Sequence, residues 1–329
     1  MRLLIIKLVI VLMRFFGVIF GVIFSVSPLR IKKNITILLK DISIKLPKKI
    51  SMLIYNFSYE LVKKIYARSR IEVLLKRSFK EGFVMMLDVT KKTQRSIYLK
   101  EQYEPPVLNF IKRNLKLGGI FIDIGSNVGF YSLLGSKIIG SGGLVLSFEP
   151  ESYNFSKLKL NIDINNMKNI QTYNKAIGAF SKKAKLHINP FNEGGHSLES
   201  NEYYYDNHKS WKLDVVRNKF PKIALEQDVD VVSLDNILRK NKLKAENINL
   251  IKIDIEGHEL SALMGMRDLL KGASAPNIIC EVGRDYQDIK KLLTGLEYEL
   301  FSLNDDGSPS AINTYSAGGN LLFIKKRLE

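Results

Sequence analysis

Cysteine and histidine are scarce in this chain of 329 residues, which contains one Cys and four His. A single cysteine cannot form an intramolecular disulfide, and the scattered histidines give no Cys/His spacing typical of zinc. The sequence therefore predicts neither a disulfide scaffold nor a resident metal. Cys280 lies in the apolar run NIICEV, where we expect a buried structural thiol.

Acidic residues are scarce in the first third of the chain. Residues 1–115 contain 23 Lys and Arg but 7 Asp and Glu, whereas residues 116–329 contain 27 and 26. The net charge of +17 therefore belongs almost entirely to the N-terminal part. Such a segment suits an anionic membrane surface, or the solvated face of ordinary helices, better than it suits nucleic acid. We expect no nucleic-acid partner.

Charge is almost absent from residues 8–27, where Arg14 is the one charged residue. Twenty helical residues span roughly 30 Å, the thickness of a bilayer's hydrocarbon core. A cleavable signal peptide is the alternative. However, Pro28 directly follows the small residues that would form the cleavage site, and a proline there disfavours cleavage. We expect residues 1–30 to be an uncleaved membrane anchor that spans the bilayer or lies in its interface, with the rest of the chain on the cytoplasmic side.

Residues 31–100 form a basic extension. Apolar residues recur at spacings of three and four between residues 35 and 80, which predicts helices, and residues 83–99 read as a hairpin that leads into the main domain. The apolar stripe of these helices would pack on that domain, on the bilayer or on a second subunit, so the oligomeric state stays open.

A glycine-rich turn follows an apolar strand in the sequence FIDIGSNVGFYS at 121–132. Asp123 precedes Gly125, but Asn127 and Phe130 replace two of the three glycines that a dinucleotide site requires. The turn instead suits S-adenosylmethionine, whose amino-acid end is small and charged. A second strand ends in Glu149, which is placed to accept both ribose hydroxyls. Taken alone, such a turn is equally often only a tight connection.

Strand-like segments alternate with amphipathic helical ones along the rest of the chain. The predicted strands cover residues 120–124, 144–148, 170–174, 249–253, 277–282, 297–302 and 320–326, and the predicted helices include 152–164 and 259–270. This alternation predicts an α/β fold with a doubly wound, mostly parallel sheet and helices on both faces. Ligands bind beyond the carboxyl ends of such strands, so the motifs that follow them should converge there.

Between Tyr103 and Ile324 the chain resembles the FkbM family of S-adenosylmethionine-dependent methyltransferases. The landmarks are YEP at 103–105, FIDIGSNVGFYS at 121–132, FEP at 148–150, IKIDIEGHE at 251–259 and PNIICEV at 276–282. The resemblance implies a class I, Rossmann-like methyltransferase with a seven-stranded sheet and methyl transfer to a hydroxyl, commonly on sugars or other natural products. We assign residues 101–329 to this domain; residues 1–100 and 195–225 gain no support from the resemblance.

Nine residues are candidates for binding the cofactor. Asn174 and Ala176 are expected near the adenine, and Glu104 either closes over the cofactor or caps the helix near Pro105. The full set is Glu104, Asp123, Gly125, Ser126, Asn127, Gly129, Glu149, Asn174 and Ala176.

Methyl transfer to a hydroxyl requires a general base, because the sulfonium donor is already activated. Asp254, Glu256 and His258 follow the fourth strand and are the catalytic candidates. We favour Asp254 as the base and Glu256 as a structural partner. His258 has the most suitable ordinary pKa, but Gly257 can start a helix that turns the imidazole away. Two acids alone do not predict a metal site.

Residues 191–228 are the expected acceptor region, because they contain Trp211 and three consecutive tyrosines from Tyr203. Aromatic rings interleaved with polar groups suit the face of a sugar, although a packed lid would look similar. We expect a small-molecule or glycan acceptor, such as the sugar of a glycolipid held near the membrane. The alternatives are an inactive cofactor-binding protein tethered to the membrane and an N-methyltransferase, which would more often carry an Asn/Asp-Pro-Pro-Tyr sequence.

Overall fold

A computed structural model describes residues 72–100, 102–189, 194–198, 226–283, 285–312 and 319–326. These residues divide into two compact units. The first holds residues 72–75 and 87–100, and the second holds residues 76–86 and the described residues from 102 onward. The expected membrane anchor lies outside the described residues. Within the described ranges, no helix has both the length and the apolar character needed to cross a bilayer.

The hairpin expected over residues 83–99 is wrong in position. Strands β1 (Leu74–Ser78) and β2 (Val84–Asp88) form a two-stranded sheet, and helix α4 (Lys92–Lys100) follows. The prediction of helices up to residue 80 is therefore also wrong at its end, because Leu74–Ser78 form β1. Strand β2 ends at Asp88, and the Oδ1 of Asp88 accepts hydrogen bonds from the N–H groups of Val73 and Thr90. Such a local side-chain bond starts a turn, which α4 then continues.

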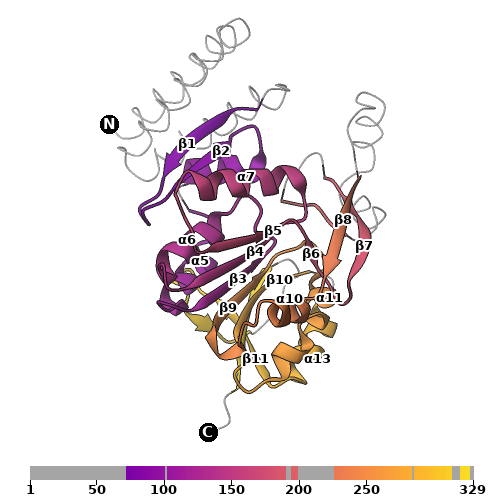
Figure 1. Cartoon of the computed structure of the whole chain (residues 1–329). Helices are drawn as coiled ribbons and strands as arrows, with labels where there is room; N and C mark the ends of the chain where they lie inside the picture. The colour runs from indigo at the N-terminus through magenta and orange to yellow at the C-terminus, as the bar shows by residue number, and fades with distance from the viewer. Residues whose placement is uncertain are drawn as a thin grey trace, which may run out of the picture. The chain divides into compact units, whose positions relative to one another are not determined.

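The main sheet of the second unit has eight strands in the order β12-β11-β13-β10-β9-β3-β4-β5 (Figure 1). Strands β10, β9, β3, β4 and β5 are parallel, whereas β13 runs antiparallel to both β10 and β11. All seven predicted strands are present, with ends within one residue of the prediction, and β12 is added. Their bounds are β3 Ile120–Ile124, β4 Leu144–Phe148, β5 Ile170–Tyr173, β9 Ile248–Ile253, β10 Asn277–Val282, β11 Tyr298–Leu303, β12 Pro309–Ser310 and β13 Gly319–Lys325.

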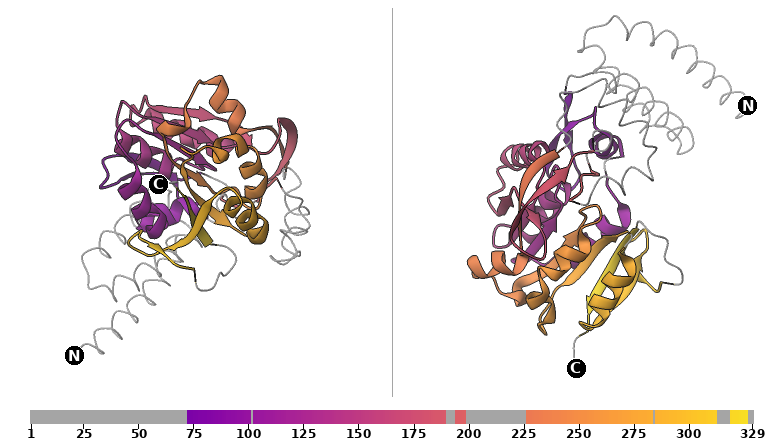
Figure 2. Two further views of the ribbon diagram at one scale, coloured as in Figure 1. Left: turned by 90° about the horizontal axis from the view of Figure 1, so that it is seen from below. Right: turned by 90° about the vertical axis from the view of Figure 1, so that its right-hand side faces the viewer.

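Helices cover both faces of this sheet, as predicted (Figures 1 and 2). On one face, Ile122 and Ile124 belong to a continuous apolar core with the helices from α10 to α13. Because side chains alternate along a strand, Phe121 and Asp123 lie on the opposite face, where α6 packs closely enough for Gly135 to contact the Phe121 ring. The helices are α5 Pro105–Asn114, α6 Phe130–Ile139, α7 Ser152–Asp163, α10 Leu234–Lys240, α11 Glu259–Met264, α12 Arg267–Lys271 and α13 Tyr286–Thr294, with a 3-10 turn at Ala245–Asn247.

The helix expected over residues 259–270 is two helices, α11 and α12. They separate at Gly265, where an added Cβ would lie 2.0 Å from the carbonyl oxygen of Gly178. Gly178 follows β6 (Ala176–Ile177), which belongs to a separate sheet with β8 (Glu226–Val232) and β7 (Lys182–His187) in the order β6-β8-β7. The close approach of the loop after β6 therefore accompanies the break in the helix.

Candidate functional site

The glycine turn after β3 is pressed against the end of β9. Gly125 has φ +82°, and an added Cβ would lie 1.8 Å from the carbonyl oxygen of Asp254. The Asp254 N–H in turn donates to the carbonyl oxygen of Ile124 at 3.0 Å. Only glycine fits this position, because both its conformation and its surroundings exclude a side chain. The turn and Asp254 are thereby fixed to one another through their main chains.

Glu149 links the turn after β3 to the turn after β4. Its Oε2 accepts a hydrogen bond from the N–H of Asn127 at 2.8 Å, and its Oε1 accepts one from the N–H of Glu151 at 3.0 Å. Burial raises the pKa of Glu149 to about 8, although these backbone bonds act in the opposite direction. Each oxygen keeps a second lone pair, so the carboxyl can still accept ribose hydroxyls, as the sequence suggests.

The other residues of the turn hold its shape. Ser126 is buried and donates from Oγ to the carbonyl oxygen of Asp123 at 2.8 Å. Asn127 has φ 49°, and Gly129, at the start of α6, has φ 96° with Leu158 packed against it. The N-terminus of α6 consequently follows directly from the turn, an arrangement that leaves N–H groups available to a ligand.

The end of β5 reaches the same edge of the sheet. Asn174 donates from Nδ2 to the carbonyl oxygens of Glu149 and Pro150, both at 2.9 Å. Ala176 is buried and pairs with Val231 of β8. The structure therefore brings Asn174 beside Glu149 and places Ala176 within the smaller sheet.

Asp123 is the centre of a buried polar row that crosses the main sheet. It lies in register between Ser147 of β4 and Lys252 of β9, and it is 1% exposed. Its Oδ2 accepts a 2.6 Å hydrogen bond from Ser132 of α6, whereas its Oδ1 has no hydrogen-bond partner among the described residues. Burial raises the pKa of Asp123, and Lys252 opposes this shift. An unsatisfied buried carboxylate oxygen suits a donor such as an ammonium group.

Lys252 was not among the predicted site residues. The residue is 1% exposed, its Nζ donates to Oδ2 of Asp254 at 3.0 Å, and the Nζ lies 5.0 Å from the ring centre of Tyr131. Burial alone would lower the pKa of Lys252, but Asp254, Asp123 and Glu104 raise it above its ordinary value. The ammonium is therefore charged. The sequence could have indicated that Lys252 belongs to the site, because Lys252 is the one charge inside the strand INLIKI. A buried charge requires charged or hydrogen-bonding partners.

Glu104 faces this lysine from the chain before α5. It occupies the N-cap position of α5 with φ 42°, but its side chain makes no capping hydrogen bond there. Its Oε2 instead accepts a hydrogen bond from the Tyr131 hydroxyl at 3.0 Å, and its Oε1 accepts one from Nδ2 of Asn320 at 2.9 Å. Burial raises the pKa of Glu104, which Lys252 opposes.

Asp254 is paired with a second acid. Its side chain is 17% exposed, and it shares a hydrogen bond with Glu281, which lies in the neighbouring strand β10, one residue beyond the register pair of Ile253 and Cys280. Burial would raise the pKa of Asp254, but Lys252 and this hydrogen bond hold it below its ordinary value. Burial raises the pKa of Glu281 to about 10, with the negative charge of Asp254 as the second cause. Glu281 is a family landmark that the sequence did not assign to the site.

Glu256 and His258 lie in the loop that joins β9 to α11. Glu256 has φ 54°, and its carbonyl oxygen accepts a 2.7 Å hydrogen bond from the hydroxyl of Ser197. His258 is 8% exposed at the start of α11, where its Nε2 lies toward Gly178 and would be 3.2 Å from an added Cβ there. The imidazole thus faces the loop after β6.

Ser197 connects the expected acceptor region to this loop. It is buried, and it exchanges backbone hydrogen bonds with His187 at the end of β7. Residues 194–198 are described, whereas the remainder of the region between 190 and 225, with Trp211 and the tyrosines, lies outside the described residues.

The residues at these strand ends fit S-adenosylmethionine. Asp123 offers its unpartnered Oδ1, Gly125 and Gly129 let a ligand approach the main chain, and Glu149 offers its remaining lone pairs. Over the described part of the chain, no set of three or more His, Cys, Asp and Glu side chains is arranged to hold a metal ion.

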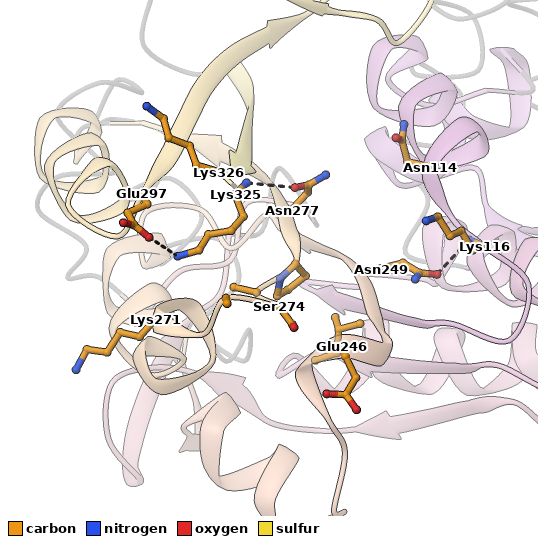
Figure 3. A pocket seen from close by; sticks show the side chains of 14 residues that line it. Asn114, Lys116, Glu246, Asn249, Lys271, Ser274, Asn277, Glu297, Lys325 and Lys326 are labelled. Carbon is orange, nitrogen blue, oxygen red and sulfur yellow. Dashed lines mark hydrogen bonds and ion pairs between the residues drawn. The ribbon is translucent and has the colours of Figure 1, made fainter. Parts of the chain in front are cut away.

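A cavity of about 720 Å³ lies at the other end of the strands (Figure 3). Its walls include Asn249 and Asn277, near the starts of β9 and β10, and Lys325 at the end of the antiparallel β13. Ligands of parallel α/β sheets bind beyond the carboxyl ends of the strands, so we assign the candidate site to Asp123 and Asp254 and not to this cavity.

Comparison with known proteins identifies a family over the central part of the chain. Residues 123–302 match the methyltransferase FkbM domain. The chain is 24% identical over 203 residues to Methyltransferase 1 of Beauveria bassiana. The aligned region covers 59% of this chain and 78% of that protein. The chain is also 24% identical over 207 residues to the hexuronic acid methyltransferase AglP of Haloferax volcanii, covering 62% of this chain and 74% of that protein.

Among solved structures, the crystal structure of the methyltransferase FkbM from Methylobacillus flagellatus superimposes with a TM-score of 0.40 and 16% identity. The match covers 87% of this chain and 58% of that one, so this chain spans little more than half the length of that protein.

Proposed function

We propose that this chain, which belongs to the FkbM family of S-adenosylmethionine-dependent methyltransferases, methylates a hydroxyl group. The proposed hydroxyl belongs to a sugar within a glycan or glycolipid. The observation that carries the hydroxyl is the cluster of carboxyls at the carboxyl ends of β9 and β10, in which Asp254 hydrogen bonds to both Lys252 and Glu281. A hydroxyl loses a proton on methylation, and this cluster offers a group to accept it.

The protein has to hold the donor, align the acceptor and remove this proton. S-Adenosylmethionine supplies an activated methyl group on a sulfonium. Asp123 and the turn from Gly125 to Gly129 would hold its amino-acid end, and Glu149 its ribose. Because Gly125 contacts the Asp254 main chain, the residue proposed as base is fixed in place relative to the residues that hold the donor.

The charges at the site favour a neutral acceptor group over a carboxylate. Glu104, Asp254 and Glu281 lie together, and Lys252, which faces them, already donates to Asp254. An acceptor carboxylate would meet this acidic cluster and would be repelled. A sugar hydroxyl carries no such charge. The similarity to a hexuronic acid methyltransferase supports a sugar as the acceptor class, but a hexuronic acid carries both hydroxyls and a carboxylate, so the choice of the hydroxyl rests on the charges of the site.

We include membrane association in this proposal. The apolar stretch at residues 8–27 and the basic excess of residues 1–115 would hold the enzyme beside an anionic bilayer, where glycolipid intermediates are found. Flotation of the full chain with vesicles that contain anionic lipid tests this part. We expect binding that a variant without residues 1–30 loses, and full binding by that variant would contradict the anchor.

The acceptor group is tested with trideuteromethyl-labelled cofactor and a panel of neutral sugars, uronic acids and lipid-linked sugars. We expect a labelled product whose methyl group survives mild alkali, because methyl ethers resist the hydrolysis that removes methyl esters. Asp254→Asn should lower turnover by about 10²- to 10⁴-fold, whereas the exposed Asp163→Asn on α7 should not change it. A label that alkali removes would overturn the hydroxyl, and labelling confined to amines would favour an N-methyltransferase.

A further inference from the structure

Two carboxyl groups that hydrogen bond to each other must share a proton, because two carboxylates have no hydrogen to donate. Asp254 and Glu281 are in this position. Ile253 and Cys280 are register partners in the parallel pair of β9 and β10, so the next residues, Asp254 directly after β9 and Glu281 within β10, lie side by side. Their side chains hydrogen bond to each other. The pair therefore carries one proton in the cofactor-free protein.

The surroundings decide which member of the pair holds this proton. Lys252 donates to Asp254 at 3.0 Å, which stabilises Asp254 as a carboxylate. The charged groups that act on Glu281 are acids, namely Asp254, Glu256 and Glu104. Burial and these acids raise its pKa to about 10. Glu281 is therefore the protonated member at neutral pH.

The wider environment is acidic. Several titratable groups face the pair or the residues that contact it. They lie on the chain before α5, on α6, on strands β3, β9 and β10, and on the loop into α11. They are Tyr103, Glu104, Asp123, Tyr131, Lys252, Glu256, Glu259 and Cys280. Lys252 is the one cation among them, so the site as a whole favours a positively charged ligand. A positive charge that enters such a site makes the loss of a proton easier.

We propose that Asp254 and Glu281 work as a proton-exchanging pair, which releases its proton when the positively charged cofactor binds and takes up the acceptor's proton as the methyl group is transferred. The first half depends only on cofactor binding. The second half rests on the proposed transfer to a hydroxyl.

The step is balanced in atoms and charge. The acceptor oxygen forms a bond to the methyl carbon, and the bond from that carbon to sulfur breaks, with its electron pair left on sulfur. The hydroxyl proton moves to the carboxylate pair, which returns to one proton. The sulfonium charge disappears in the same step, so the condition that released the proton is removed and the pair again favours holding it. No further acid, base or oxidant is needed.

The test compares S-adenosylmethionine with S-adenosylhomocysteine, which lacks both the methyl group and the positive charge. Calorimetric titration at pH 7.5 in buffers of different ionisation enthalpy counts the protons exchanged when each ligand binds. We expect the wild type to release up to about one proton more with S-adenosylmethionine than with S-adenosylhomocysteine. Glu281→Gln, which cannot ionise, should bind both ligands with no difference in proton count.

Glu299→Gln is the matched control, because Glu299 is a half-exposed acid on β11 and pairs with Lys326. It should keep the wild-type difference. Equal proton counts for the two ligands in the wild type would overturn the proposal, and so would a Glu281→Gln variant that keeps the difference.

A second measurement needs no variant, in case Glu281→Gln does not fold. The infrared difference spectrum of wild-type protein with each ligand should show less protonated carboxyl absorption with S-adenosylmethionine. An unchanged carboxyl band would contradict the pair. Neither experiment contains an acceptor, so a failed search for a sugar substrate would leave both outcomes intact.

Discussion

Two lysines of the main sheet are buried among the described residues, and they are held in different ways. Lys325 on β13 donates from Nζ to the carbonyl oxygens of Leu270 and Leu296, at 3.2 and 2.7 Å, near the ends of α12 and α13. Lys252 on β9 donates to the carboxylate of Asp254. Each ammonium also lies about 5 Å from a tyrosine ring.

The difference lies in the partners. Lys325 also lies 3.8 Å from the carboxylate of Glu297, but that side chain is 59% exposed and solvent screens the pair. Its buried partners are backbone carbonyls, which cannot titrate, so Lys325 stabilises two helix ends in the same way at every pH near neutrality. Carboxyls can titrate, so Lys252 decides which of several acids stays ionised. The same residue type therefore stabilises helix ends at the amino ends of the parallel strands and holds a cluster of carboxyls at their carboxyl ends, where we propose the proton exchange.

Replacing each lysine with methionine should give the largest difference between the two positions. Lys252→Met leaves buried carboxylates without a cation, and we expect a loss of about 3 to 5 kcal/mol in the free energy of unfolding at neutral pH. Lys325→Met leaves carbonyls without a donor and should cost about 1 to 3 kcal/mol. Urea unfolding measures both.

Acid should separate the two variants further. Asp254 can be protonated in Lys252→Met, so part of its lost stability should return at pH 5, whereas Lys325→Met should show no such recovery. Turnover should fall by at least about 100-fold in Lys252→Met. Lys325→Met should keep its turnover wherever it is folded. Equal pH dependence in the two variants would remove the distinction between them.

The pH dependence of the wild-type unfolding free energy tests the role of Glu281 in the carboxyl cluster. The pKa of Glu281 rises from its ordinary 4.5 to about 10 in the folded protein. The folded state thus binds this proton more tightly, so its contribution to stability is complete below pH 4.5 and is lost as pH rises toward 10. We expect Glu281→Gln to flatten this part of the curve of unfolding free energy against pH. A variant with the wild-type slope would show that Glu281 is not the group responsible.

Two glycines with similar backbone angles offer a test of the turn itself. Gly118 has φ +75° with nothing within 4 Å of an added Cβ, whereas Gly125 has φ +82° and would place that Cβ 1.8 Å from Asp254. Gly118→Ala should cost about 1 to 2 kcal/mol, from backbone strain alone. Gly125→Ala adds a steric clash, so it should lose more stability and weaken binding of S-adenosylhomocysteine in calorimetry. Unchanged binding by folded Gly125→Ala would separate the turn from the cofactor.

The strands of the main sheet were predictable from the sequence because they are short, continuous apolar runs. The first errors arise where local pattern and tertiary contacts disagree. Ile97 and Tyr98 are consecutive strand formers, yet they lie in α4. Arg95 of that helix is buried and donates to the carbonyl oxygens of Val89 and Thr90, a contact that no periodicity reveals.

The site was predictable in its individual motifs but not in its assembly. Asp123, Glu149 and Asp254 could be placed because each lies near or directly after the carboxyl end of a recognisable strand. Glu104 and Asn320 could not be paired, since their hydrogen bond joins residues 216 positions apart and depends on the antiparallel register of β13 with β10. Proton sharing depends on such pairings, because the protonation of an acid is set by the groups around it.

The smallest expected effect comes from an exposed acid that is also held by lysines. Asp230 on β8 forms ion pairs with Lys175 at 2.9 Å and with Lys183, whose hydrogen bonds lower the pKa of Asp230 to about 2. Its contribution to stability is present above its ordinary pKa of 3.8 and is lost as pH falls toward 2. Asp230→Asn should therefore lower Tm slightly at neutral pH and low salt, and the difference should vanish at pH 2 or in 1 M salt, since water and ions screen exposed charges. A large or salt-insensitive change in Tm would contradict this, because it would mean that an exposed ion pair behaves like the buried pair of Lys252 and Asp254.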